Sequence, residues 1–248
     1  MKQIDTENWH RNKTYEIGAK PIPTLPERVT IDDVKEYLDD ISLLPIGINR
    51  KNLNVYRYNF RKSLINIITS KNIETSVEFM SNILEELKLI KNLNVVLLDA
   101  ERLLQNNNLE LNYKNFKLNV DNNLNKNKQI LCVIIGIDKF INDLENGEEE
   151  FLELLKSTEG LKNYNYIIVD NHTRLKNREY DNWYKEYISG DTGIWVGNGI
   201  NDQYLITTNY TNSDRINNCG ESFGYVIKQS EPNLIKLLGM KEKGDENG

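Results

Sequence analysis

The chain has 248 residues, of which 39% are hydrophobic and 27% charged, and its formal net charge is −6. This length suits one large α/β domain or two small ones. No run approaches the roughly 20 apolar residues of a membrane span, and no charged-then-apolar signal segment opens the chain. We therefore expect it to be soluble as it stands, and this agrees with its being the cytosolic end of a membrane protein.

The charge balance and the few cysteines and histidines exclude several classes of function. An acidic chain, with a pI near 5.2, disfavours a nucleic-acid motor, which needs a basic face. Only Cys132 and Cys219 are present, and a reduced cytosolic compartment fits them best. His10 and His172 have no acidic or cysteine partners at ligand spacing, so we expect no metal site.

The pattern divides the chain into a polar linker or arm over residues 1–20, one domain over 21–240 and a disordered tail over 241–248. In chain order, the first part of the domain is predicted to hold a helix at 30–38, a turn at 43–48, strands at 55–58 and 64–68, a helix at 77–87 and a strand at 95–99. An exposed loop is predicted at 105–128, with at most an edge strand at 116–118. The rest is predicted to hold a central strand at 130–137, a helix from 139 broken at 146–147 and ending at Gly160, a strand at 166–170, a helix at 180–188, and strands at 193–197 and 223–227. This alternation predicts an α/β fold with a mostly parallel sheet and helices on both faces.

The segment from Leu64 to Leu87 has the strand, turn and helix of a P-loop without its chemistry. A phosphate cradle needs glycines and a lysine just before a Ser or Thr, in the pattern G-x-x-x-x-G-K-S/T. Here Thr69 and Glu74 replace the glycines, Thr75 replaces the lysine, and only Ser76 fits. The sequence therefore predicts a relic of a nucleotide site.

The residues that replace the P-loop pattern also have physical effects that disfavour phosphate binding. Glu74 places a fixed carboxylate at the helix end that would otherwise attract phosphate. Thr75 and Glu78 match a capping box, which would close the free backbone donors. Lys71 lies in the turn and could swing toward a ligand, so a nucleotide site remains an alternative. The residues of this predicted relic are Ser70, Lys71, Glu74, Thr75, Ser76, Asp99 and Asp138.

The carboxylates that would hold Mg²⁺ are also displaced. Asp99 ends the strand after the P-loop-like helix, whereas Gly136 and Ile137 occupy the Walker B positions of the central strand. Asp138 is better interpreted as the N-cap of the helix starting at Lys139. Asp170 and His172 end a later strand, and we interpret them as polar loop residues. We predict no catalytic residue and no cofactor, with ATP and Mg²⁺ as the alternative.

An aromatic stripe marks the predicted helix at 180–188. Tyr180, Trp183, Tyr184 and Tyr187 recur at helical spacing and so share one face. The plain interpretation is that this face packs on the sheet. The alternative is a partly exposed surface that binds a partner, because Tyr and Trp are common interface anchors.

The order of these features resembles a family. The resemblance rests on the segments 21–27 (PIPTLPE), 44–48 (LPIGI), the relic P-loop, 193–199 (GIWVGNG) and 224–228 (GYVIK). Together, over about residues 17–238, they resemble the last ATPase module of the EssC family of type VII secretion coupling proteins, in the FtsK/SpoIIIE group. No single motif is diagnostic, whereas the order and spacing are fairly specific.

The resemblance implies a RecA-like P-loop NTPase fold at the cytoplasmic face of the membrane. It also implies contact with WXG-type export substrates or their partners, and with neighbouring ATPase modules of the same chain. Among the P-loop residues only Ser76 carries over. We thus expect a catalytically silent module that recognises substrates. The alternatives are a weak ATP-binding module using Lys71 with Asp99 or Asp138, and a purely structural packing module.

Overall fold

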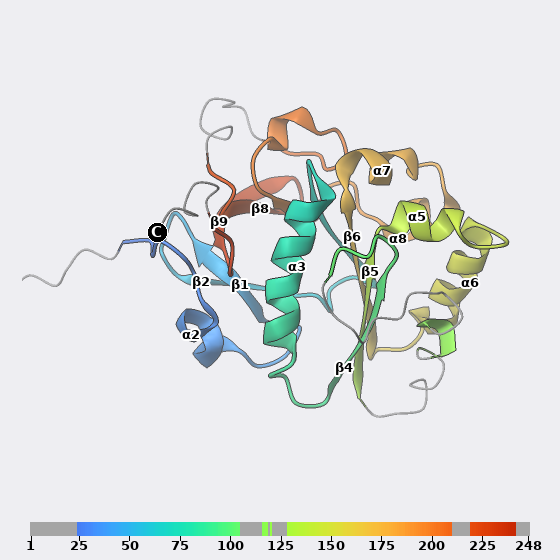
Figure 1. Ribbon diagram of the computed structural model, residues 1–248, viewed down its shortest axis with the longest axis horizontal. Coiled ribbons are helices and arrows are strands. Elements are labelled where there is room, and N and C mark those ends of the chain that lie inside the picture. Colours follow the sequence, from blue (N-terminus) through green and yellow to red (C-terminus); the bar gives the residue numbers. More distant parts are fainter. Residues whose placement is uncertain (1–23, 105–115, 119, 121–127, 210–218, 242–248) are drawn as a thin grey trace, which may run out of the picture.

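The computed structural model describes residues 24–104, 116–118, 120, 128–209 and 219–241 (Figure 1). The predicted arm at 1–20 and, apart from Lys241, the predicted tail lie outside these residues. The elements are α2 Ile31–Val34, the 3₁₀ turn η1 Lys35–Tyr37, β1 Leu44–Asn49, β2 Val55–Tyr58, β3 Ile65–Ser70, α3 Ile73–Leu87, β4 Leu93–Asp99, β5 Gln129–Ile135, α5 Ile137–Asn142, α6 Glu148–Glu159, β6 Tyr164–Asn171, α7 His172–Asn177, α8 Asn182–Tyr187, β7 Gly193–Val196, the 3₁₀ turn η2 Ile200–Asp202, β8 Phe223–Lys228 and β9 Glu231–Leu237.

The described strands form one nine-stranded mixed sheet in the order β2-β1-β9-β8-β7-β3-β6-β5-β4. The run β7-β3-β6-β5-β4 is parallel throughout. The pairings among β2, β1, β9, β8 and β7 are all antiparallel. The prediction of a mostly parallel sheet is therefore right for one half of the sheet and wrong for the other.

The antiparallel half arises from hairpins that the sequence pattern conceals. β8 and β9 are joined by Gln229 and Ser230, both with positive φ, at 51° and 65°. Two-residue hairpin turns with this geometry are usually signalled by Asn-Gly or Asp-Gly. Gln-Ser gives no such signal, and Pro232 further disguises β9, which the sequence did not predict.

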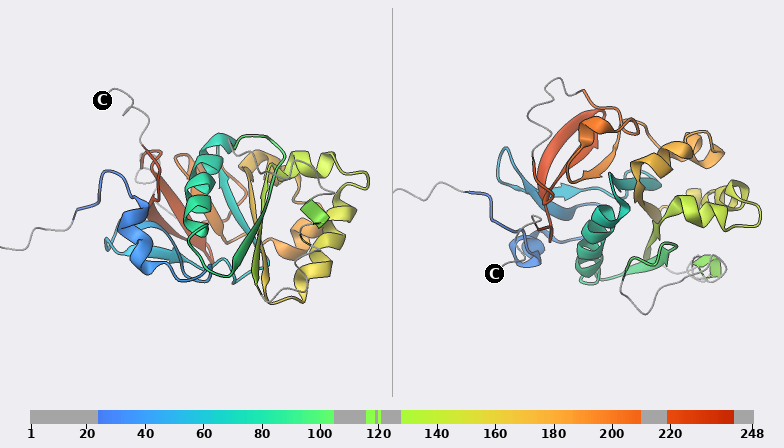
Figure 2. Two further views of the ribbon diagram at one scale, coloured as in Figure 1. Left: turned by 60° about the horizontal axis from the view of Figure 1, so that its bottom comes forward. Right: turned by 45° about the horizontal axis from the view of Figure 1, so that its top comes forward.

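Helices cover both faces of the sheet, as predicted (Figure 2). On one face, α3 buries Phe79, Met80 and Ile83 in a cluster that also includes Val34 of α2. On the other face, α6 buries Phe151, Leu154 and Leu155 in a cluster with residues of α5, α7 and α8.

The predicted loop over 105–128 is described only in part. Phe116–Leu118, where an edge strand was the most that the sequence allowed, are helical, so that expectation is wrong. Phe116 and Val120 are fully buried in the core, which explains their apolar character. Within the described ranges, none of the helices has the length and apolarity that a membrane crossing requires.

Candidate functional site at the carboxyl edge of the parallel strands

The five parallel strands all end at one edge of the sheet, which we call the carboxyl edge (Figure 1). Helices α3, α5 and α7 begin there, directly after β3, β5 and β6. Open α/β sheets bind ligands at this edge, so the residues of a nucleotide site would have to lie close together here.

The turn between β3 and α3 is shorter than the sequence indicates. β3 extends through Thr69 and Ser70, which pair with β6 and β7 on either side. α3 already begins at Ile73, so only Lys71 and Asn72 connect the strand to the helix. The predicted turn over 69–76 is thus wrong at both ends, because strand and helix each extend into it.

The serine hydroxyls of this turn bond to each other. Ser70 and Ser76 are buried, and their Oγ atoms lie 2.5 Å apart. The Ser70 hydroxyl donates to the backbone oxygen of Asn72 at 2.5 Å, which leaves Ser76 as the donor to Ser70. The hydrogen bonds of both side chains therefore close the turn internally.

The start of α3 differs from the predicted capping box. Asn72 is the N-cap residue and Thr75 lies inside the first turn, where its N–H donates to Asn72 at 3.1 Å. Thr75 and Glu78 therefore do not form a box, and this expectation is wrong. Glu74 does lie in the first turn, as predicted, with its side chain exposed.

A second segment lies over the same turn. Lys71 Nζ is 3.5 Å from Asp202 Oδ2 of η2, and both side chains are more than 60% exposed. A Cβ placed on Gly197 would lie 3.4 Å from Thr75 Cγ2. The residues after β7 thus approach the position where a P-loop would receive phosphate.

Asp99, a predicted metal-binding carboxylate, lies away from Ser70 and Ser76. Asp99 ends edge strand β4, and β5 and β6 lie between it and β3. It is fully buried, and its Oδ2 accepts a hydrogen bond from Leu104 N at 2.8 Å. Among the described residues, no group of three or more His, Cys, Asp or Glu side chains could hold a metal.

Asp138 has a different role from the predicted N-cap. α5 begins at Ile137, and Gly136 caps it in a left-handed conformation with φ of 76°. Asp138 lies in the first turn, where its Oδ1 accepts a hydrogen bond from Arg178 Nε at 2.7 Å. The N-cap prediction is wrong because the helix starts two residues earlier than predicted.

Asp170 is the polar centre of the edge, which the sequence argument missed. It is fully buried and accepts hydrogen bonds from the N–H groups of Asp138 at 3.1 Å and Asn171 at 2.8 Å. Arg174 lies 3.7 Å from Asp170 and 2.6 Å from Glu101. Burial raises the pKa of Asp170 to about 6. The signal was available, since Asp170 lies one residue before the end of β6, whose preceding residues are all buried.

His172 lies beside the same strand ends. Its Nδ1 is 3.3 Å from the Ser70 backbone oxygen, and its ring centroid lies 5.5 Å from that of Trp195. It therefore packs into the edge of the sheet next to the β3–α3 turn, instead of standing free as a polar loop residue.

The aromatic stripe divides into buried and exposed members. α8 begins at Asn182, so Tyr180 lies outside it and is 75% exposed. Trp183 and Tyr184 are buried, and the Trp183 ring packs edge-on against Phe151 with centroids 5.3 Å apart. The Tyr187 hydroxyl donates to Glu159 at 3.2 Å. The prediction that the stripe packs in the core is therefore right for Trp183 and Tyr184. Of the four aromatic residues, only Tyr180 is widely exposed to a partner.

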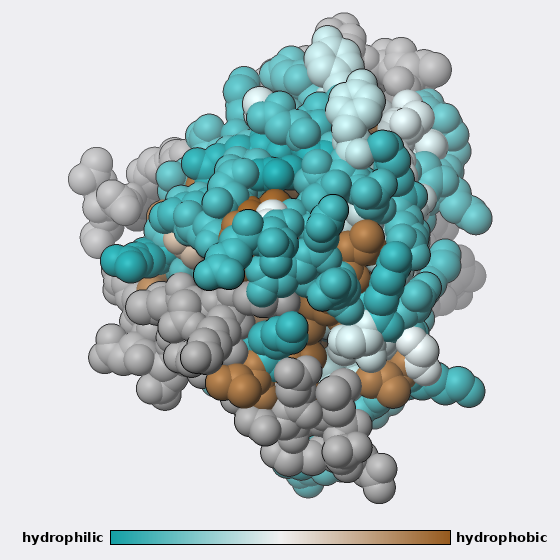
Figure 3. All heavy atoms as spheres, turned by 90° about the vertical axis from the view of Figure 1, so that its right-hand side faces the viewer, coloured by the Kyte–Doolittle hydropathy of each residue, from teal (hydrophilic) through white to brown (hydrophobic). Residues whose placement is uncertain are grey.

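The face that carries α5 and α6 offers no broad apolar surface among its coloured atoms. Figure 3 shows mainly hydrophilic residues there, with small separate hydrophobic patches. A partner that bound this end would meet polar side chains first.

Solved structures share this fold. The chain matches the cytoplasmic domain of EssC with a TM-score of 0.68 at 15% identity, over 94% of this chain and 51% of that one. It matches EssC ATPases 2 and 3 from Geobacillus thermodenitrificans with a TM-score of 0.70 at 14% identity, over 95% and 49%. Thermomonospora curvata EccC ATPases 2 and 3, in complex with a signal sequence peptide, match with a TM-score of 0.59 at 14% identity, over 90% and 45%.

The structural neighbours are thus cytoplasmic ATPase domains of EssC and of the type VII secretion ATPase EccC. At these identities the likeness establishes the fold, and the chain spans about half the length of these structures or less. No family model and no curated protein matches the sequence.

Proposed function

We propose that this chain is a RecA-like module of a type VII secretion motor that does not hydrolyse nucleotide and acts by contacting polypeptide partners. The observation that carries the proposal is the two-residue connection between β3 and α3. The neighbours are ATPase domains, so the natural ligand of this edge would be ATP with Mg²⁺.

The residues present fit that ligand poorly. A P-loop wraps backbone N–H groups around the phosphates and directs its Ser or Thr hydroxyl to Mg²⁺. Here Thr69 and Ser70 belong to a strand paired on both sides, and the Ser76 hydroxyl bonds to Ser70. A triphosphate would have to break the end of β3, which supports a silent site.

The charges near the turn support the same conclusion. Lys71 is paired with Asp202, and Glu74 adds a carboxylate to the first turn of α3. Asp99 lies two strands away from β3. A nucleotide would therefore meet two carboxylates close to the turn and one lysine that already has a partner.

The partner role rests on the neighbours. One EccC structure holds a signal sequence peptide, and the neighbouring structures contain further ATPase modules in the same chain. By analogy we propose WXG-type secreted proteins or their associated substrates, together with adjacent ATPase modules, as partners at the cytoplasmic face of the membrane. Tyr180 and the accessible part of Tyr187 remain the proposed aromatic contacts.

One observation favours weak nucleotide binding as a second candidate. The Lys71–Asp202 pair is exposed and 3.5 Å long, and such pairs contribute about 0–1 kcal/mol. Lys71 could therefore leave Asp202 at little cost and reach a phosphate. A purely structural module is the third candidate, and it would bind neither nucleotide nor peptide.

Calorimetric titration with Mg-ATP, beside a thermal-unfolding scan, separates the first two candidates. A real site at about a hundredfold excess over Kd would stabilise the fold by about 2.7 kcal/mol, and Lys71→Ala would remove that gain. We expect no heat and no shift for either protein. A clear heat that Lys71→Ala abolishes would overturn the silent-site proposal.

A further inference from the structure

The outer face of the antiparallel half carries basic side chains that form no ion pair with any carboxylate of the described residues. Phe223, Lys236, Ile48 and Val55 stand opposite one another across β8, β9, β1 and β2, so their side chains share this face. Arg57 follows Val55 by two residues on β2 and points the same way. We call this surface the cationic sheet face and define it by Arg50, Arg57, Phe223 and Lys236.

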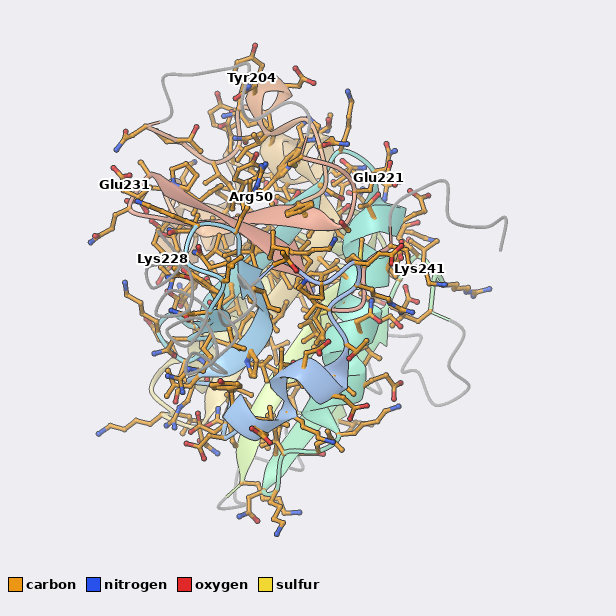
Figure 4. The ribbon with its side chains drawn as sticks, turned by 90° about the vertical axis from the view of Figure 1, so that its left-hand side faces the viewer. Arg50, Tyr204, Glu221, Lys228, Glu231 and Lys241 are labelled. Carbon is orange, nitrogen blue, oxygen red and sulfur yellow. The ribbon has the colours of Figure 1, made fainter. Side chains whose placement is uncertain are left out.

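Two of these cations lie on an aromatic ring. Arg50 Cζ is 5.8 Å and Lys236 Nζ is 5.2 Å from the centroid of Phe223. Phe223 is itself only partly buried. Arg50 lies over β8 and β9 in Figure 4, with Glu231 to one side and Glu221 to the other. Both cations are within the distance at which a cation is attracted to the face of an aromatic ring.

The cations of this face take no part in the ion pairs found among the described residues. Seven other basic side chains of the described residues form ion pairs: Lys35, Arg61, Lys71, Lys88, Arg174, Lys176 and Arg178. Within the same described ranges, Arg50, Arg57 and Lys236 belong to none of these pairs. In a chain of net charge −6, the exposed side chains of Arg50 and Arg57 offer positive charge on this face, whereas Lys236 is buried beside Phe223.

In the described part of the chain, the strands of this face pack mainly against other strands. The main neighbours of β8 and β9 are each other, β1 and β7. Partly exposed apolar side chains, Ile48, Val55 and Leu234, surround the cations. Arginine and aromatic residues on a flat apolar surface are typical of protein interfaces.

We infer that the cationic sheet face binds a polypeptide whose carboxylates surround an apolar side chain. The apolar group would pack on Phe223, Ile48 and Val55, while the carboxylates would pair with the exposed Arg50 and Arg57. Two of the cations lie beside the Phe223 ring at the sheet. We therefore favour a polypeptide that packs on the sheet and not the headgroups of a lipid membrane. This inference adds a second polypeptide contact to the one proposed at Tyr180 and Tyr187, and it rests on the proposed function.

A synthetic amphipathic peptide with Leu on one side and Glu on the other tests the inference, beside its Gln analogue. We expect the folded chain to bind the Glu peptide at least about tenfold more tightly than the Gln peptide, with affinity falling as salt rises. Arg50→Glu with Arg57→Glu should abolish the preference. Lys88→Glu with Lys156→Glu changes the net charge equally, at the C-cap of α3 and on α6, and should preserve the preference. Arg50→Gln is the milder variant if the double reversal perturbs folding, and it should weaken binding of the Glu peptide.

Four results would overturn the inference. The first is equal binding of the Glu and Gln peptides, and the second is equal loss in both double variants. The third is binding only to vesicles containing phosphatidylserine, which would assign the face to a membrane. Acidic-peptide binding that survives both Arg50→Glu and Arg57→Glu would reject this face while leaving a polypeptide-binding role intact.

Discussion

Three buried residues, Thr69, Glu86 and Asp99, carry side-chain oxygens that have no hydrogen-bond partner in the part of the chain that the structure describes. Glu86 is the most unusual of them, because both carboxyl oxygens are unpaired and the residue is fully buried in α3. Burial raises the pKa of Glu86 to about 8. The side chain is therefore protonated at neutral pH, since an unpaired buried charge would cost more.

Replacing Glu86 by glutamine should remove part of the pH dependence of stability. The folded pKa lies above the usual 4.5, so the stability that this group contributes is present below about pH 4.5 and is lost as the pH rises through 8. At pH 9 we expect Glu86→Gln to be more stable than the original chain, by on the order of 3 kcal/mol. Urea unfolding at pH 5 and pH 9 measures this difference. Exposed Glu85 is the matched control, and equal pH profiles for Glu86→Gln and the original chain would refute the argument.

Ser76 offers a second test at this scale. In a working P-loop this hydroxyl would serve the metal, whereas here it bonds to Ser70 inside the closed turn. Ser76→Ala should cost about 1 kcal/mol of folding stability, because Ser70 keeps its bond to Asn72. Chemical unfolding measures the cost, with exposed Ser81→Ala as the control in the same helix. A Ser76→Ala protein with unchanged stability would show that the bond is unimportant.

At the scale of elements, α8 shows what periodicity does and does not decide. The spacing of Tyr180, Trp183, Tyr184 and Tyr187 suggested one aromatic face, yet α8 is only Asn182–Tyr187. Tyr180 falls outside it because Asp181 has an extended backbone as the N-cap. Spacing alone cannot reveal where a short helix begins.

Alanine substitutions should separate packing from exposure along this stripe. Trp183→Ala removes a fully buried ring that packs on Phe151, so we expect a loss of about 3–5 kcal/mol. Tyr180→Ala, at a side chain that is 75% exposed, should change stability by less than about 0.5 kcal/mol. Thermal and urea unfolding of both variants provide the measurement. Similar losses at the two positions would contradict the observed burial.

Most interior elements could be predicted from the sequence, and the errors have physical causes. The apolar runs at β3, β4, β5 and β6 identify buried parallel strands, and the stripe of α3 identifies its core face. Element ends were wrong where polar residues are buried, as at Thr69 and Ser70. A polar residue in a sequence normally indicates a loop, and only the neighbouring strands show that these two continue the sheet.

For the whole molecule, no sequence pattern indicates how the two halves of the sheet join. β7 is parallel to β3 on one side and antiparallel to β8 on the other. That arrangement depends on long-range pairing, and no local pattern encodes it. The family resemblance supplied the overall class, and the structural neighbours agree with it in fold. Ser70 and Ser76 lie at the carboxyl edge, and the sequence did not predict that β3 would extend to Ser70 or that residues 197–202 would approach the turn.

Hydrogen–deuterium exchange of the folded chain, with and without saturating Mg-ATP, tests the closed carboxyl edge most directly. The structure predicts slow exchange for the amides of Ile65–Ser70 and no change over Lys71–Ser76 when Mg-ATP is added, because strand and helix already occupy this turn. Protection that appears over Lys71–Ser76 only with Mg-ATP would show that the turn opens and binds phosphate. Such protection would contradict the account of a silent module.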